Sequence, residues 1–369
     1  MTSLFELAAS HPLTGYGWDE GFADSFTPYA AEGLTPGRII RVDRGRCDLV
    51  VPDGEGVRTV HADTALVTTG DPLRIMCTGD WAAVDLAQGF VRALLPRRTA
   101  FVRSTSSQRS EGQILAANVD HAVIAVSLAV ELDLGRIERF LALAWESGAA
   151  PVVVLTKADL VTETAGPEVL GHLVADTEAS APGVPVLAVS ATTGEGVDIL
   201  AATLSGGTSV LLGQSGAGKS TLANALLGED VQTVQAARDR DGKGRHTTTT
   251  RNLLALPGGG VLIDTPGLRG VGLWDAESGV AQTFSEIESL AARCRFHDCG
   301  HEAEPGCAVL EAVETGELRR RRLDSYRKLL RENQRIAART DARLRAEIRR
   351  DWKKKQALGR EMVARKRGR

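Results

Sequence analysis

Short apolar runs alternate with helical spacing through the middle of the chain. The runs at 122–126, 151–156 and 185–190 have the length and apolar content of buried strands, and helical periodicity fills 135–147 and 167–180 between them. Strands and helices in this alternation are typical of a parallel sheet with crossover helices. We therefore expect a central α/β domain.

The preceding region, residues 33–95, has a different pattern. Four short alternating runs, GRIIRVD, CDLVVP, GVRTVHA and DWAAVDL, are separated by glycine, proline and aspartate. Strands at this spacing over about 60 residues predict a five-stranded OB-type barrel, a common platform for single-stranded nucleic acid. The only aromatic residues here are Trp81 and Phe90, so the pattern equally fits a small β-domain that contacts a protein or a ribosome.

Two flanking segments carry weaker signals. Residues 1–32 are mixed and glycine-interrupted, and we expect an extension with one short helix. Residues 95–104, LPRRTAFVRS, read as a basic linker whose arginines either contact phosphates or stay solvated.

A glycine-rich loop between an apolar run at 210–212 and a helical pattern ending at Gly228 is the strongest chemical signal. It follows the pattern G-x-x-x-x-G-K-[ST], with a strand before it and a helix after it. Glycines let successive backbone N–H groups turn toward phosphate oxygens, and the helix adds its positive end. We expect Lys219 to contact the β- and γ-phosphates during catalysis and Ser220 to ligate Mg²⁺. The predicted nucleotide-binding residues here are Gly213, Gln214, Ser215, Gly216, Ala217, Gly218, Lys219, Ser220 and Thr221.

Two loops at the ends of earlier strands could bind a base. The first contains Thr156, Lys157, Ala158 and Asp159. A carboxylate at Asp159 can accept from the N1–H and exocyclic amine of guanine together, and adenine lacks that donor pair. Taken alone, Asp159 could equally cap a helix. The second loop, Ser190 and Ala191, could bind the guanine oxygen through backbone N–H groups.

The strand predicted at 261–264 ends in an acid and leads into Thr-Pro-Gly. We expect Asp264 to hold Mg²⁺ and the Gly267 N–H to contact the γ-phosphate. Residues 238–252 are rich in glycine and charge, and Thr248 or Thr249 would complete the Mg²⁺ shell and order this loop.

Three of the five cysteines lie close together near the C-terminal end, beside a histidine. The set is Cys294, Cys299, His301 and Cys307. Three thiolates and one imidazole suit a tetrahedral, structural Zn²⁺ site with no open position, and the odd number of cysteines argues against disulfides. The alternative is a set of reduced core cysteines.

These motifs resemble those of a Ras-like GTPase in permuted order, because the base-reading loops precede the phosphate loop. With a barrel in front and a cysteine cluster behind, residues 33–330 resemble the ribosome small-subunit-dependent GTPase family, RsgA or YjeQ/YloQ. The resemblance implies an OB-type barrel, a circularly permuted P-loop GTPase domain and a zinc-binding helical module. It also implies GTP hydrolysis stimulated by the small ribosomal subunit during late maturation of that subunit.

Two positions depart from common GTPase patterns. Thr156 stands where asparagine is usual, so guanine selectivity should depend on Asp159. Leu268 stands where Ras-like enzymes place a water-orienting glutamine, so intrinsic hydrolysis should be slow. His246 is the in-chain candidate for the missing group, and a solvent-exposed loop histidine is the alternative.

Charge is distributed unevenly along the 369 residues. From Arg319 to the C-terminus there are 21 Lys and Arg against 6 Asp and Glu, whereas the net charge of the whole chain is −3. A helix at 316–336 should pack through Leu323 and Tyr326, and the basic tail after it could bind rRNA phosphates. The chain has no apolar stretch of the roughly 20 residues needed to span a membrane and no secretory signal, so we expect a cytoplasmic protein. We also expect a monomer, although no sequence pattern specifies the oligomeric state.

The sequence thus predicts five segments: 1–32, a barrel at 33–100, a permuted GTPase domain at 105–275, a zinc-binding helical domain at 276–336 and a basic tail at 337–369. The expected partners are GTP or GDP, the small subunit and its rRNA. Two alternatives stay open: a permuted GTPase acting on another ribosomal precursor, and a zinc-containing RNA-binding module that uses guanine nucleotide only as a structural ligand.

Overall fold

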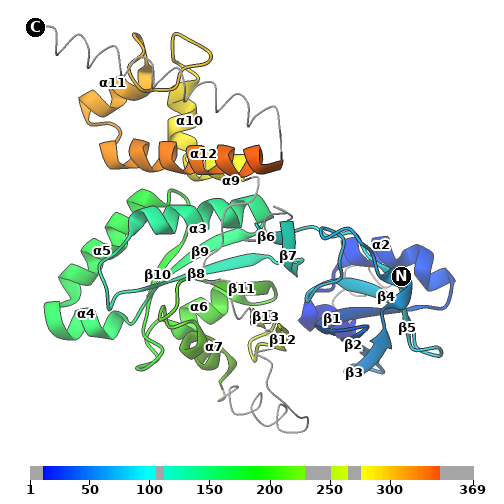
Figure 1. The fold of residues 1–369 in the computed structure, drawn as a ribbon. Helices are drawn as coiled ribbons and strands as arrows, with labels where there is room; N and C mark the ends of the chain where they lie inside the picture. Colours follow the sequence, from blue (N-terminus) through cyan, green and yellow to red (C-terminus); the bar gives the residue numbers. More distant parts are fainter. Residues whose placement is uncertain (1–10, 105–111, 229–250, 265–275, 341–369) are drawn as a thin grey trace, which may run out of the picture.

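A barrel, a six-stranded sheet and a group of helices follow one another along the chain (Figure 1). The structure, a computed structural model, describes residues 11–104, 112–228, 251–264 and 276–340. Within these ranges no helix is long and apolar enough to cross a bilayer.

The predicted barrel is present and closed, in the strand order β1-β2-β3-β5-β4. A short 3₁₀ turn, η2 (Ala65–Val67), follows β3. Alternating strand residues such as Ile39, Leu49 and Val84 point into a buried core, because side chains of a strand alternate between its two faces. The strands are β1 (Thr35–Asp43), β2 (Arg46–Asp53), β3 (Gly56–Asp63), β4 (Trp81–Asp85) and β5 (Phe90–Leu94).

The N-terminal extension packs on the outer face of this barrel and forms a second apolar cluster with it. It forms η1 (Pro12–Tyr16) and the expected helix, α2 (Glu20–Ala31). Trp18 packs edge-on against Trp81 of the barrel at 4.8 Å between ring centroids, and Phe22 lies 5.5 Å from the same ring. These aromatic rings cover the outer side of the barrel, so the extension with its expected helix is packed against the barrel.

The expected basic linker is also structural. Arg97 pairs with the buried Asp80 at 2.6 Å and donates to the carbonyl oxygens of Leu73 and Ile75. Arg98 pairs with Asp19 at 2.5 Å. Both guanidinium groups therefore have carboxylate partners within the protein, which argues against their proposed role as phosphate contacts.

A two-stranded antiparallel pair connects the barrel to the central domain. It consists of β6 (Ala100–Ser104) and β7 (Gly112–Ala117). The predicted boundary between residues 100 and 105 falls inside this pair.

The central sheet has the order β10-β9-β8-β11-β13-β12, parallel except for β12. Along β9, Val153 and Leu155 pack toward α3, whereas Val152 and Val154 pack toward α6 and α7. Helices therefore cover both faces (Figure 1). The strands are β8 (His121–Ser127), β9 (Ala150–Thr156), β10 (Val186–Val189), β11 (Thr208–Leu212), β12 (Asn252–Ala255) and β13 (Val261–Asp264). The helices are α3 (Leu134–Ser147), α4 (Ala158–Ala165), α5 (Pro167–Ser180), α6 (Val197–Leu204) and α7 (Lys219–Leu227).

The C-terminal helices stack on α3 (Figure 1). They are α9 (Glu277–Thr283), α10 (Ser285–Ala291), α11 (Ala308–Thr315) and α12 (Arg320–Thr340). α12 buries Leu323, Tyr326 and Leu329 on one face, as its spacing predicted. We call residues 276–340 the C-terminal module.

Candidate functional site

The phosphate loop lies at the point where the order of the parallel strands reverses. β8 leads along the sheet to β9 and β10, whereas β11 leads the other way to β13. Ligands of such sheets bind at the carboxyl ends of the strands at this point. The loop between β11 and α7 therefore occupies the position at which a nucleotide is expected.

The glycines of this loop are required by its backbone. Gly213, Gly216 and Gly218 all have positive φ, and a Cβ on Gly213 would lie 2.4 Å from the carbonyl oxygen of Ala125. The Lys219 amine donates to the carbonyls of Gly213 and Gln214 at 2.7 and 2.5 Å. Ser220 and Thr221 lie exposed in the first turn of α7, beside the loop.

The first base-reading loop is tied directly to the phosphate loop. The Thr156 hydroxyl donates to the carbonyl oxygen of Ala217 at 2.8 Å, and the Lys157 amine donates to that of Gly216 at 3.0 Å. Lys157 holds a positive φ of 61°, which aims the following residues into α4. The structure thus brings the two predicted motifs, 61 positions apart in sequence, into one site.

Asp159 stands in the first turn of α4, after Ala158. Its Oδ1 atom is buried and has no hydrogen-bond partner among the described residues. Burying a carboxylate oxygen without a partner is costly unless a ligand supplies the donor. The helix-capping alternative is not supported, because α4 has no side-chain cap bond.

In the second base-reading loop, one of the two backbone N–H groups expected to face the base already has a partner. The Ser190 N–H donates to the carbonyl of Glu195 at 2.9 Å, so this group is already used. The Ala191 N–H has no acceptor among the described residues, which leaves Ala191 as the donor that could face a ligand. The Ser190 hydroxyl instead accepts from the Thr193 N–H and shapes the turn.

Several predicted residues lie outside the described part of the chain. They are His246, Thr248, Thr249, Gly267 and Leu268. For Asp264 the structure describes only the backbone. As the last residue of β13, it pairs with Asn252, the first residue of the antiparallel strand β12.

The four predicted metal ligands converge between α10 and α11. Their ligand atoms all lie within 4.8 Å of one another, so the cluster of Cys294, Cys299, His301 and Cys307 could hold a metal ion. Burial lowers the pKa of His301, which favours the neutral imidazole that binds metals. Cys307 caps α11 and accepts from the Leu310 N–H, so its sulfur lies at the positive end of a helix.

Glu304 fixes the loop that carries these ligands. Its carboxylate accepts from the N–H groups of Gly300, Glu302 and Ala303 at 2.7–2.9 Å. Backbone hydrogen bonds to the charged form lower the pKa of Glu304 to about 2. The loop therefore keeps its shape through its own backbone as well as through the cysteines.

Comparison with known proteins agrees with this geometry. A family model described as RsgA GTPase matches residues 94–274. A small ribosomal subunit biogenesis GTPase RsgA from Streptomyces avermitilis is 73% identical over 98% of this chain and 96% of its own length. The chain belongs to the RsgA GTPase family. It is therefore a GTP hydrolase.

Two further members of this family extend the comparison. RsgA of Streptomyces coelicolor is 69% identical over 100% of this chain and 99% of its own length. The crystal structure of YjeQ from Thermotoga maritima has a TM-score of 0.60 at 26% identity and covers 81% of this chain and 98% of that one. The expected fold class, with a barrel before the GTPase domain and a cysteine–histidine cluster after it, is confirmed.

One group of functional candidates in the RsgA GTPase domain was not predicted from the sequence: a buried ionic cluster between α3 and the C-terminal module. Glu138 is fully buried there and contacts Arg321 and Arg322 of α12. A signal was present, since Glu138 follows Leu134 by four residues and precedes Leu141 by three, on the apolar stripe of α3. An acid on such a stripe indicates a buried partner elsewhere in the chain.

Proposed function

We propose that this chain hydrolyses GTP in the maturation of the small ribosomal subunit, with Mg²⁺ at the phosphates and zinc in the cysteine cluster. The two Streptomyces relatives carry that activity in their names, and they align with this chain nearly from end to end. The subunit would stimulate hydrolysis, since position 268 carries leucine rather than a group that can orient water.

The observation that supports guanine specificity is the buried, unpartnered Oδ1 of Asp159. Asp159 lies two residues after Lys157, whose amine donates to the Gly216 carbonyl of the phosphate loop. The carboxylate would accept from the N1–H and N2–H of guanine, and adenine offers no such pair. Thr156 and Lys157 would hold the two loops together through Ala217 and Gly216. Ala191 would donate to the guanine oxygen.

Magnesium chemistry fits the residues around the loop. The Ser220 hydroxyl is exposed at the start of α7, and β13 ends at Asp264 on the neighbouring strand of the sheet. A bound Mg²⁺ neutralises developing charge on the phosphates, and Lys219 would add its own charge there. Thr248 or Thr249 would supply the remaining protein ligand, and His246 is our candidate for orienting water.

Zinc suits the donor set of the cluster. The Cys294 and Cys307 sulfurs lie 3.8 Å apart, and His301 Nδ1 lies 3.4 Å from the Cys307 sulfur. Tetrahedral Zn²⁺ with Zn–S bonds of about 2.3 Å places its sulfur ligands about 3.8 Å apart. All four ligands come from the protein, so the ion would stabilise the fold and perform no chemistry.

The basic C-terminus would contribute rRNA contacts. Residues 340–369 hold 12 Lys and Arg against 4 Asp and Glu, whereas the rest of the chain is net negative, which concentrates attraction for phosphate at this end of the chain. Removing residues 340–369 should weaken binding to the small subunit and flatten its salt dependence. Unchanged affinity and slope would refute this role.

Phosphate release from GTP and from ATP, with and without purified small and large subunits, tests the proposal. We expect slow release from GTP alone, faster release with small subunits and negligible release from ATP. Stimulation by large subunits only would favour action on the other ribosomal precursor. Absence of any release would favour an RNA-binding module with a structural nucleotide.

A further inference from the structure

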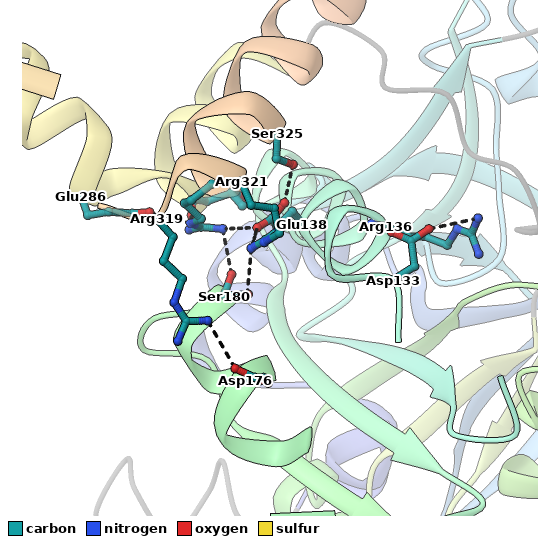
Figure 2. Close-up of polar contacts among 11 residues, drawn as sticks. Asp133, Arg136, Glu138, Asp176, Ser180, Glu286, Arg319, Arg321 and Ser325 are labelled. Carbon is teal, nitrogen blue, oxygen red and sulfur yellow. Dashed lines mark hydrogen bonds and ion pairs between the residues drawn. The ribbon is translucent and has the colours of Figure 1, made fainter. Parts of the chain in front are cut away.

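Glu138 of α3 is held entirely by the C-terminal module. Its side chain has no exposed surface, and its oxygens accept from Arg321 and Arg322 at 2.8 Å each and from the Ser325 hydroxyl. Figure 2 shows Arg321 and Ser325 of α12 on either side of this carboxylate. All three donors belong to α12. A carboxylate of the GTPase domain is thus neutralised by groups from a different part of the chain.

Arg322 extends this contact to the rest of the module. It is only 3% exposed and also binds Glu286 of α10 at 2.6 Å. Its remaining donors reach the carbonyl oxygens of Ser180 and Thr283 at 2.9 and 2.5 Å, and its guanidinium stacks 4.3 Å from the ring of Phe284. One side chain therefore joins α3, α5, α9, α10 and α12.

Such a cluster is better suited to fixing an orientation than to adding stability. Buried ion pairs gain little over apolar packing, because both charges lose their hydration. Their geometry is nevertheless strict, since each charge must meet its partners. We therefore expect the cluster to allow one placement of the module on α3.

The same turn of α3 faces the phosphate loop on its other side. Arg136, Ile137 and Phe140 line a cavity of about 210 Å³ together with residues 214–217 of the loop. Ile137 is the neighbour of Glu138 in sequence. The turn of α3 that contacts the C-terminal module through Glu138 therefore also borders the backbone of the phosphate loop.

A second connection runs through the segment between β8 and α3. The Leu128 N–H donates to the carbonyl of Thr156 at 3.0 Å, and Thr156 in turn binds Ala217. Asp133 caps the start of α3 by accepting a hydrogen bond from the backbone N–H of Arg136. A displacement of α3 would thus move the anchors of both nucleotide-binding loops.

We propose that Glu138 is a positioning residue for GTP hydrolysis, which transmits the placement of the C-terminal module through α3 to the phosphate loop. The effect on the rate of hydrolysis rests on the proposed function, because it requires stimulation by the small subunit. A partner that holds the module in one orientation would set the position of α3, and so the geometry of residues 213–219. The route acts in addition to the direct chain connection between β13 and α9.

Three single substitutions test the role of Glu138. Glu138→Gln keeps the shape and removes the charge that orients Arg321 and Arg322. Arg321→Gln removes a half-exposed partner of Glu138, and it replaces Glu138→Gln as the test variant if Glu138→Gln does not fold. Arg319→Ala is the matched control, because its pair with Asp176 joins the same module to α5 but lies exposed.

Two measurements on full-length, metal-loaded protein decide the matter. The first is the rate of GTP hydrolysis with and without small subunits, alongside the Kd for GTP and cosedimentation with the subunit. We expect Glu138→Gln to keep its basal rate, Kd and subunit binding within about threefold and to lose at least tenfold of the stimulated rate. Arg319→Ala should match the wild type throughout.

The second measurement, hydrogen exchange of peptides from residues 208–228 in the GDP-bound chain, needs no ribosome. We expect faster exchange in Glu138→Gln than in Arg319→Ala. Wild-type stimulation and exchange in a folded Glu138→Gln protein would overturn the inference. Absence of stimulation in the wild type itself would contradict the proposed function, while the exchange comparison would still test Glu138.

Discussion

The Thr156 hydroxyl and the Ala217 carbonyl oxygen lie 2.8 Å apart and join the base-reading loop to the phosphate loop. Thr156 is buried, so the bond is shielded from water. The hydroxyl of Thr156 thus connects the two loops at the position where an asparagine amide is usual, although a hydroxyl offers fewer donors and acceptors than an amide.

Replacing Thr156 with valine should weaken nucleotide binding without changing the preference for a base. The substitution keeps the shape but leaves the Ala217 carbonyl without its donor, at a cost of about 1–2 kcal/mol. We expect the Kd values for GTP and GDP to rise about tenfold in calorimetric titration. A Thr156→Ser variant, which keeps the hydroxyl, is the control and should stay near the wild type.

Loss of the metal cluster should unfold the C-terminal module before the rest. Cys307→Ser removes one of four ligands, and structural zinc contributes several kcal/mol to the folding of small modules. We expect the zinc content to fall from about one per chain, as measured by elemental analysis, with a new early thermal transition. Cys47→Ser is the control: Cys47 is buried in the barrel, far from the cluster in sequence, and should leave the metal in place.

Gly279 should not tolerate a side chain. A Cβ there would lie 2.0 Å from the carbonyl oxygen of Ala142, since α9 crosses α3 at that point. Overpacking of this kind costs about 1–3 kcal/mol, so Gly279→Ala should lower the urea midpoint. Gly171→Ala, in open space on α5, should instead raise stability by up to about 1 kcal/mol. Equal effects of the two substitutions would contradict the close approach of α9 and α3.

The Asp19–Arg98 pair should give a pH-dependent contribution to stability. Hydrogen bonds from Arg98 lower the pKa of Asp19, so its contribution is present above the ordinary value and is lost as the pH falls through the folded pKa. Asp19→Asn keeps a helix-capping residue but removes the charge. We expect it to cost about 0.5–1 kcal/mol at pH 7, as for a partly exposed pair, and less as the pH falls toward 3. Urea unfolding at several pH values measures the difference, and a constant difference would contradict this explanation.

The sequence was informative wherever local pattern decides structure. α5 begins and ends at the predicted residues, 167 and 180, because Pro167 stands at the start of the helix and Pro182 follows two residues after its end. The phosphate loop and the cysteine cluster were predictable for a different reason. Their chemistry requires particular residue types at fixed spacings.

Other features depend on partners distant in sequence. Arg97 and Arg98 look like solvated charge until Asp80 and Asp19 are placed beside them. Trp18 has no evident role until Trp81 lies against it. Ser190 illustrates a finer limit, since only the folded turn shows that its N–H is already bound to Glu195.

The measurement that tests the central claim most directly compares GTP and xanthosine triphosphate binding in the wild type and in Asp159→Asn. An amide at position 159 can donate to the oxygen that xanthine carries in place of the guanine amine, but it cannot accept both guanine N–H groups. We expect the variant to bind GTP at least about 100-fold more weakly, as for loss of two charge-assisted hydrogen bonds, and to gain affinity for xanthosine triphosphate. Unchanged GTP affinity in the variant would contradict the assignment of this pocket to guanine.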